Sequence, residues 1–270
     1  MTTLLQVSDT HLGTEQDPVL QALVELARAE RPELVVLSGD ITQRARARQF
    51  RAARSFMDRL DAPALLPIPG NHDIPLFNIA ARLLAPYGNY AREFGSDLEP
   101  AFENPDLLVV GVNTTRPHRH KNGELSARQI DRVAAAARGA APEQLRIAVV
   151  HQPVLAIRPD DEENLLDNRE QALEAWAAAG VDIVMGGHVH LPYVRSLRDT
   201  YSGLARDVWT VQAGTAVSSR VREGFPNSVN IVRCQGESAP RRCVVERWDF
   251  VQAPGRFARH SSEALTFRDT

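Results

Sequence analysis

An apolar run and a polar motif meet in one stretch of the chain, and together they decide the fold. The stretch is Ala64-Leu65-Leu66-Pro67-Ile68-Pro69-Gly70-Asn71-His72-Asp73. Its first half, residues 64–68, is a short apolar run of the kind that forms a buried strand. Its second half starts with a Pro-Gly turn signal and continues with an amide, an imidazole and a carboxylate. Side chains that bind metals therefore stand directly after a predicted strand.

Four other stretches share this layout, in which an apolar run precedes acidic or imidazole side chains. They are Val7-Ser8-Asp9-Thr10-His11, Leu37-Ser38-Gly39-Asp40, Val149-Val150-His151 and Val184-Met185-Gly186-Gly187-His188-Val189-His190. Five of the 8 histidines of the protein lie in these five stretches. Because the carboxyl ends of neighbouring parallel strands meet at one crevice, we expect these side chains to converge.

Amphipathic segments separate the first apolar runs, and their period indicates helices. Val19–Glu30 and Gln43–Leu60 both place apolar side chains three and four positions apart. The arginines of the second segment are interpreted as a solvated face rather than a nucleic-acid surface. Strands and helices that alternate in this way predict βαβ units with a parallel sheet.

The pattern changes after about residue 90. Tyr90–Phe94 and Leu107–Asn113 are interpreted as strands, and Ser126 as the N-cap of a helix that ends near Arg138. Further segments alternate like antiparallel strands at residues 193–197, 208–212, 229–233 and 244–248. We predict one α/β domain over residues 1–252, with two sheets and helices outside, and a polar surface tail over residues 253–270.

The bulk properties exclude some classes of protein. A net charge of -3 gives no general attraction to nucleic acid or to an anionic membrane. No apolar stretch approaches the roughly 20 residues that a membrane-spanning helix needs, and the first predicted strand begins almost at Met1 rather than after a leader. We therefore expect a cytoplasmic protein with no membrane partner. Reduced thiols at Cys234 and Cys243 are favoured over a disulfide, although both states stay open.

The donor set indicates a particular kind of metal chemistry. Carboxylate and amide oxygens mixed with imidazoles suit Mn, Fe, Co, Ni or Zn better than Ca or Mg. So many donors exceed the needs of one ion, but they suit two ions about 3.5–4 Å apart that share a bridging carboxylate. Such a pair clamps the attacking and leaving oxygens of a phosphoryl transfer and activates a water near neutral pH.

The five stretches, in this order and at these intervals, resemble the calcineurin-like metallophosphoesterase family over roughly residues 4 to 191. The resemblance implies a four-layer αββα sandwich with two mixed sheets. It also implies two metal ions, which we expect to be Mn and/or Fe, with Zn, Co and Ni as alternatives. One ion would be bound by Asp9, His11, Asp40 and His190. The other would be bound by Asp40, Asn71, His151 and His188, with Asp40 as the bridge.

The remaining residues of the stretch at 70–73 receive catalytic roles from the resemblance. His72 would be a histidine outside the ligand set, which protonates the leaving group or stabilises the transition state. Asp73 would orient His72, although an acidic residue there is also typical of a charge at a helix N-terminus.

Within the family, the sequence is most similar to bacterial class III cyclic-nucleotide phosphodiesterases and related glycerophosphodiester hydrolases. The similarity rests on residues 6–12, 112–115 with 123–126, and 214–216 with 226–228. Gln43 stands where purple acid phosphatases carry a tyrosine ligand, and residues 39–45 depart from the serine/threonine phosphatase motif.

We therefore expect a binuclear metal-dependent phosphodiesterase that hydrolyses a small phosphodiester by in-line attack of a metal-bound hydroxide. A 3′,5′-cyclic nucleotide is the first candidate substrate. The alternatives are a phosphomonoesterase or small nuclease on the same site, or a non-catalytic metal-binding scaffold. Arg116, His118 and His120, in the loop Thr114–Glu124, are candidate substrate contacts, and a solvated loop is the alternative. The resemblance also allows a homodimer, which no residue pattern indicates.

Overall fold

The computed structural model describes residues 1–235 and 242–267, and the strands within these ranges form two mixed six-stranded sheets. The first sheet has the order β12-β11-β10-β1-β2-β3, in which β1, β2 and β3 run parallel and the others antiparallel. Its strands are β1 (Thr2–Val7), β2 (Leu34–Ser38), β3 (Ala64–Ile68), β10 (Ser228–Gln235), β11 (Arg242–Val251) and β12 (Arg256–Leu265).

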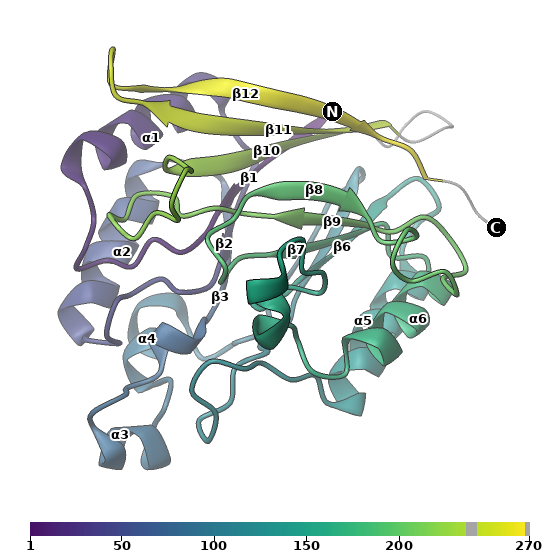
Figure 1. Cartoon of the computed structure of the whole chain (residues 1–270), viewed down its shortest axis with the longest axis horizontal. Helices are drawn as coiled ribbons and strands as arrows, with labels where there is room; N and C mark the ends of the chain where they lie inside the picture. The colour runs from purple at the N-terminus through teal and green to yellow at the C-terminus, as the bar shows by residue number, and fades with distance from the viewer. Residues whose placement is uncertain (236–241, 268–270) are drawn as a thin grey trace.

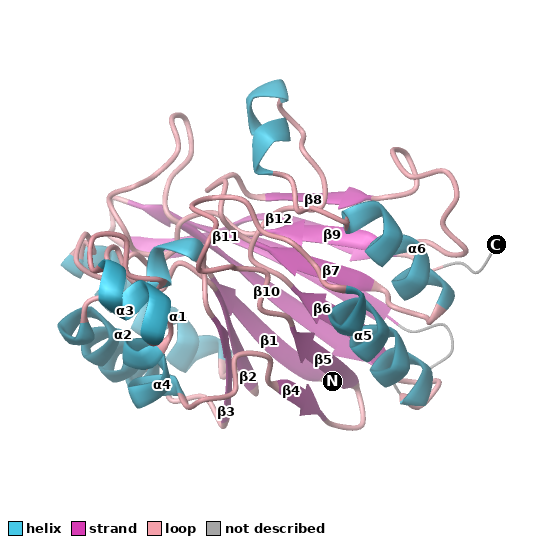
Figure 2. Cartoon of the chain, turned by 90° about the horizontal axis from the view of Figure 1, so that it is seen from below, coloured by secondary structure: helices cyan, strands magenta, loops and turns pink. Residues whose placement is uncertain are grey.

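The second sheet has the order β4-β5-β6-β7-β9-β8, with a parallel centre from β5 to β9 and an antiparallel strand at each edge. Its strands are β4 (Ala101–Glu103), β5 (Leu107–Gly111), β6 (Leu145–Val149), β7 (Ile183–Gly186), β8 (Tyr193–Ser196) and β9 (Trp209–Gln212). The two sheets lie between two groups of helices (Figure 2).

Helices cover the outer face of each sheet, as the two views of the chain show (Figure 1, Figure 2). The first sheet carries α1 (Asp17–Glu30), α2 (Ala47–Arg59), α3 (Ile79–Leu84) and α4 (Gly88–Phe94) on its side of the molecule. The second sheet carries α5 (Ala127–Gly139) and α6 (Arg169–Ala178). Short 3-10 turns follow β3 (Asn71–Asp73) and precede α6 (Pro159–Asn164).

The buried apolar residues form three clusters, one at each interface between layers. Alternation along β1 explains how one strand serves two of them, because Leu5 packs toward the helices and Leu4 toward the other sheet. The cluster between the sheets joins Leu4 to Val109 and Met185. Both faces of the central strands are therefore covered, which is why their sequences are continuous apolar runs rather than alternating ones. The four-layer prediction is confirmed.

Several predicted elements correspond closely to the structure. The predicted helix 19–30 is α1, and the Ser126 hydroxyl accepts from the Gln129 backbone N–H at the start of α5, as expected of an N-cap. The predicted helix 43–60 begins later, at Ala47, because the chain first turns through Ala45 with a left-handed φ of 51°. No helix among the described residues is both long and apolar enough to cross a bilayer.

The segment Tyr90–Phe94, predicted as a strand, is helix α4. Its aromatic side chains follow the helical period from Tyr87 rather than the period of a strand. The Tyr90 ring is fully buried and packs edge-on against Phe50, with the ring centroids 6.1 Å apart. Packing against α2 therefore selects the helix.

The predicted surface tail is also wrong for residues 256–265, which form β12. This strand pairs antiparallel with β11 from Arg256 to Leu265. Its polar residues face outward on an edge strand, while Phe257 and Leu265 are buried. That half-exposed pattern looks like a polar tail in the sequence. Residues 268–270 of the predicted tail lie outside the described residues.

The two cysteines lie opposite each other on neighbouring strands. Cys234 in β10 pairs with Cys243 in β11, and their Sγ atoms are 3.7 Å apart. Both thiols are free and buried, in line with the favoured sequence interpretation.

Candidate metal centre

The centre is built where strands of both sheets end. In the first sheet, Asp9 and His11 follow β1, Asp40 follows β2, and Asn71 follows β3. The second sheet contributes His151 after β6, and His188 and His190 after β7. The predicted ligands therefore come together at one edge of the packed sheets, as parallel strands require.

The backbone at this edge adopts an uncommon conformation. Among the described residues, nine non-glycine residues have a positive φ, and five of these are predicted ligands: Asp9, His11, Asp40, His188 and His190, with φ values from 42° to 73°. Side-chain sterics disfavour this left-handed region, so its use is typical of functional sites that the surrounding structure holds in place. The left-handed backbone that follows these strands therefore belongs to the way the five donor side chains are positioned at the centre.

Glycines allow the chain segments of the centre to approach each other. A Cβ atom at Gly187 would overlap the Ser8 hydroxyl and lie 2.5 Å from the Asp9 Oδ2 atom. Gly39 has a φ of 95°, and a Cβ there would overlap the His151 ring. Both glycines are therefore required by close contact between the two sheets.

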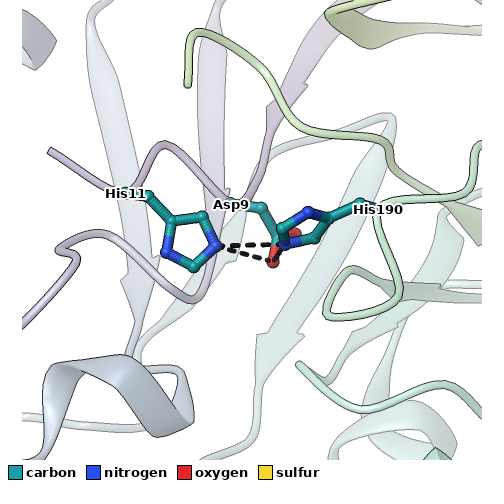
Figure 3. A group of neighbouring side chains, drawn as sticks. All are labelled: Asp9, His11 and His190. Carbon is teal, nitrogen blue, oxygen red and sulfur yellow. Dashed lines mark hydrogen bonds and ion pairs between the residues drawn. The ribbon is translucent and has the colours of Figure 1, made fainter. Parts of the chain in front are cut away.

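One group of donors consists of Asp9, His11 and His190 (Figure 3). The Nε2 atoms of His11 and His190 are 3.0 Å apart, and the His190 Nε2 atom is 3.2 Å from Asp9 Oδ1. His11 and Asp9 are fully buried. Two imidazole nitrogens and a carboxylate oxygen that face one point form a suitable set of ligands for a first-row metal.

Asp40 belongs to two further groups of donors, one with His151 and His188 and one with His11 and His72. Its Oδ1 atom is 3.3 Å from His151 Nε2, and its Oδ2 atom is 3.7 Å from His11 Nε2. Asp40 is thus placed between the two sides of the centre, where the resemblance puts the bridging ligand.

Several buried donor atoms at the centre have no hydrogen-bond partner among the described residues. They are Nδ1 of His11, Oδ1 of Asn71, Nε2 of His151 and Nδ1 of His188. Burial of polar atoms without a partner is costly, and native proteins avoid it. The orphaned atoms of Asn71, His151 and His188, together with the mixed oxygen and nitrogen donor set, fit divalent metal ions of the Mn, Fe or Zn type.

The electrostatics keep most donors in the form that binds metals. Burial lowers the pKa of His11 to about 3, although Asp40 and Asp9 oppose this shift. Burial and the nearby His151 lower the pKa of His188 to about 3. Both rings are therefore neutral at pH 7, and each has a lone pair to donate.

Other members of the centre are charged. Burial favours the neutral form of Asp9, but the neighbouring His190 outweighs it and lowers the Asp9 pKa to about 2. Burial likewise opposes the charge on His151, but Asp40 raises the His151 pKa to about 9. The Asp9 and Asp40 carboxylates are therefore ionised, and His151 must release a proton before it can bind a metal ion.

His72 lies beside the same donors. Its backbone N–H donates to Asp40 Oδ1 at 2.8 Å, and its ring stands edge-on to His11 with centroids 4.8 Å apart. The ring Nδ1 atom is 3.0 Å from the Gln43 carbonyl oxygen. His72 also falls within a possible ligand group with His11 and Asp40, so its role outside the ligand set stays a prediction.

Asp73 does not orient the His72 ring, which corrects the predicted role. Its buried carboxylate accepts hydrogen bonds from the backbone N–H groups of Ile41, Thr42 and Gly70 at 2.8–3.0 Å, and from the Thr42 hydroxyl at 2.9 Å. Asp73 therefore fastens the loop that carries Asp40 to the loop that follows β3.

The candidate substrate residues of the loop 114–124 are placed differently from one another. Arg116 is not among the described residues that line the cleft over the centre, and its guanidinium donates to Glu124, Gln129 and two backbone carbonyls, so its contact with substrate stays a prediction. His118 is exposed. His120 borders a small cavity of about 100 Å³ beside His72. Among the three, His120 is the one that the structure places near the centre.

A cleft of about 490 Å³ opens over the centre. Its lining residues are Asp40, Asn71, His72, Lys121, Asp161, Asn164, His188, Val189, His190, Arg220, Val221 and Arg222. The sequence interpretation missed Lys121, Asn164, Arg220 and Arg222. Basic and amide residues in loops carry no periodic signal, and only the neighbouring Gly214-Thr215-Ala216 motif pointed to the loop of Arg220.

Comparison with known proteins agrees with this geometry. The chain is 26% identical over 210 residues to a cAMP/cGMP dual specificity phosphodiesterase of Mycobacterium tuberculosis, which covers 69% of this chain and 61% of that protein. It is 26% identical over 219 residues to a probable cyclic nucleotide phosphodiesterase of Rhodococcus erythropolis, covering 74% of this chain and 67% of that protein. The chain thus spans about three fifths to two thirds of these relatives.

A solved structure of similar fold is the purple acid phosphatase PPD1 of yellow lupin seeds, with a TM-score of 0.69 over 98% of this chain and 53% of that one, at 12% sequence identity. This likeness concerns the fold alone. Residues 2–192, which contain all the predicted metal ligands, match the family described as calcineurin-like phosphoesterase. The chain therefore belongs to the calcineurin-like phosphoesterase family.

Proposed function

We propose that this protein is a metal-dependent phosphodiesterase that hydrolyses a small phosphodiester at a binuclear centre. The observation that carries the proposal is the position of Asp40, whose two carboxylate oxygens face donors on both sides of the centre. Asp9, His11, Asp40 and His190 would hold one ion. Asp40, Asn71, His151 and His188 would hold the other. When bound, such a pair supplies an activated water and a clamp for the phosphoryl oxygens.

The residues of the chain itself contribute orientation and proton transfer. The Gln43 carbonyl accepts from Nδ1 of His72, so the other ring nitrogen, Nε2, is left to face the cleft. To protonate the leaving alkoxide, His72 would have to carry a hydrogen on both ring nitrogens; it would then give up the Nε2 proton and keep the Nδ1 hydrogen on the Gln43 carbonyl. Asp73 supports this arrangement indirectly, because it holds the loops that carry Asp40 and Asn71 in register.

A 3′,5′-cyclic nucleotide is the first candidate substrate, supported by the names of the curated relatives. The cleft lining favours a second candidate, a diester of a small polar alcohol such as glycerol. Apart from histidines, no aromatic side chain stands among the described residues that line the cleft, so no Phe, Tyr or Trp is present to stack a nucleobase.

The test is steady-state hydrolysis by protein stripped of metal and reloaded with Mn. The substrates are bis(p-nitrophenyl) phosphate, p-nitrophenyl phosphate, 3′,5′-cyclic AMP and a glycerophosphodiester. Turnover of diesters well above the monoester supports the proposal, and the ratio of the last two substrates selects between the candidates. A preference for the monoester would instead make the protein a phosphomonoesterase.

A nuclease and a non-catalytic scaffold are distinguished by separate tests. A steep dependence of substrate affinity on salt would favour a nuclease. Two bound metals without turnover of any substrate would favour the non-catalytic scaffold. The cytoplasmic location, the homodimer and the choice of Mn and/or Fe stay predictions.

A further inference from the structure

Arg220 lies in the loop after β9, and hydrogen bonds fix the backbone of this loop against other parts of the chain. The Ser219 N–H donates to the Thr14 carbonyl at 2.9 Å, and the Arg220 N–H donates to the Ser218 hydroxyl at 3.0 Å. The Asn227 amide donates to the Ser218 carbonyl at 2.7 Å. The backbone of Arg220 is therefore held in one place at the edge of the cleft.

The carbonyl of Arg220 supports one of the metal ligands. It accepts a hydrogen bond from His190 Nδ1 at 2.6 Å. Because a carbonyl can only accept, Nδ1 carries the hydrogen and Nε2 is left with a lone pair that faces Asp9 and His11. This contact depends on the backbone alone, so it survives a change of the Arg220 side chain.

The Arg220 side chain reaches the opposite side of the centre. Its Nη1 atom donates to the Gln43 Oε1 atom at 2.9 Å and lies 3.4 Å from His72 Nε2. Gln43 thus holds His72 by its backbone carbonyl and Arg220 by its side-chain amide. Gln43 stands where purple acid phosphatases carry a tyrosine ligand. Here its side chain positions the guanidinium of Arg220 instead.

Most donors of this guanidinium remain available to a ligand. A guanidinium has five N–H donors, and the described residues offer acceptors only to Nη1. Arg220 lines the cleft together with Asp40 and Asn71. The nearby Arg222 differs, because its Nη1 atom is paired with both carboxylate oxygens of Asp161 at 2.7 and 2.9 Å.

We propose that Arg220 is a catalytic residue that binds the two non-bridging phosphoryl oxygens of the substrate, one through Nε and one through Nη2. This inference rests on the proposed phosphodiesterase function. The planar fork of the guanidinium matches two acceptor oxygens, and its fixed positive charge stabilises the charge that builds up on the phosphoryl group in the transition state. Gln43 is the positioning residue, because its side-chain oxygen accepts a hydrogen bond from the Arg220 guanidinium and fixes its orientation.

The test compares Arg220→Ala, Arg220→Lys and Gln43→Ala with the wild type, all loaded with Mn. Arg195→Ala is the matched control, because Arg195 is exposed on β8, away from the residues that line the cleft, and its guanidinium donates to the neighbouring Val194 carbonyl. Three quantities are measured: metal per chain, the affinity for inorganic phosphate by calorimetry, and kcat and KM for bis(p-nitrophenyl) phosphate.

We expect Arg220→Ala to keep its metal, to bind phosphate about 10-fold to 100-fold more weakly, and to lose about 100-fold to 1,000-fold in kcat/KM. Arg220→Lys should recover part of both losses, since an ammonium keeps the charge but not the fork. Gln43→Ala should show a smaller loss than Arg220→Ala, and Arg195→Ala should match the wild type.

The failure of this inference is distinct from the failure of the proposed function. Unchanged phosphate affinity and kcat/KM in Arg220→Ala would overturn the role of Arg220. Loss of metal from both Arg220 variants would also overturn it, because the side chain would then act on the centre rather than on the substrate. A wild type without diester turnover, whose phosphate binding still depends on Arg220, would overturn only the proposed reaction.

Discussion

The Nε2 atoms of His11 and His190 face each other at 3.0 Å, although one ring follows β1 of the first sheet and the other follows β7 of the second. The His190 ring is turned by its contact with the Arg220 carbonyl, and burial keeps His11 neutral with a pKa of about 3. Two ring nitrogens that face one point beside Asp9 form a group that could hold a cation. We therefore expect the packing of the two sheets and the binding of metal to be coupled.

Metal removal should lower the thermal stability of the protein. An ion that binds only the folded state at 1,000 times its dissociation constant stabilises it by about 4 kcal/mol. We expect a chelator to lower Tm and added Mn to restore it, as measured by calorimetry. His190→Ala should reduce this metal-dependent shift. The control is His260→Ala, which changes an exposed histidine on β12, and an equal shift in both variants would contradict the assignment.

The shared position of Asp40 predicts a specific metal stoichiometry. Asp40→Ala should lower the metal content of both sites, because its two oxygens face both groups of donors. His190→Ala should lower the content of one site only, leaving about one ion per chain. Elemental analysis after gel filtration measures both. Equal metal contents in the two variants would show that Asp40 is not a bridge.

Asp73 should matter for stability rather than for proton transfer. Asp73→Asn replaces an acceptor of four hydrogen bonds with an amide whose NH2 group faces backbone donors. The expected loss is about 1–3 kcal/mol in the free energy of unfolding, which is typical of buried donors left without an acceptor. Urea denaturation of the metal-free protein measures it, with the exposed Asp131→Asn as the control. A fully stable Asp73→Asn would refute the loop-fastening role.

Close contact between the sheets at Gly187 predicts a strong effect of one methyl group. Gly187→Ala places a Cβ against Ser8 and Asp9, so we expect a lower Tm and a lower metal content. Gly203→Ala is a matched control, because a Cβ there meets nothing within 4 Å. Similar Tm values for the two variants would mean that the backbone at Gly187 can shift enough to accommodate the added methyl group.

The pH dependence of stability should include a contribution from Glu246 on β11. Burial favours its neutral form, but hydrogen bonds from Arg259, Trp248 and Arg233 outweigh burial and lower the Glu246 pKa below its usual range. A lowered pKa means that its stabilising effect is fully present above the pKa of the unfolded chain, about 4.3. The effect is lost as the pH falls through the lower folded value.

Glu246→Gln tests this contribution in urea denaturation at several pH values. The variant should be less stable than the wild type at pH 7 by about 1.5–3 kcal/mol. The difference should shrink as the pH falls below about 4. A difference that is constant from pH 7 to pH 3 would show that the charge of Glu246 does not stabilise the fold.

Elements with a clear period were predictable, and elements selected by packing were not. The buried strands β1, β2, β3 and β6 stood out because both faces are covered. Helix α4 was missed because a short aromatic segment is ambiguous until Tyr90 meets Phe50 of α2. Strand β12 was missed because its polar face is exposed at the edge of a sheet.

The sequence by itself determined which donors exist and that they follow parallel strands, because a short apolar run ending in a polar motif is visible without any partner. It also indicated the family. Only the tertiary structure decided which donors share a point in space, since that depends on how the ends of β1 to β3 meet the ends of β6 and β7 across two sheets. The same packing brought Arg220 to His72 across 148 residues of chain and engaged Arg116 with Glu124 and Gln129, because side-chain direction depends on contacts that no local pattern records.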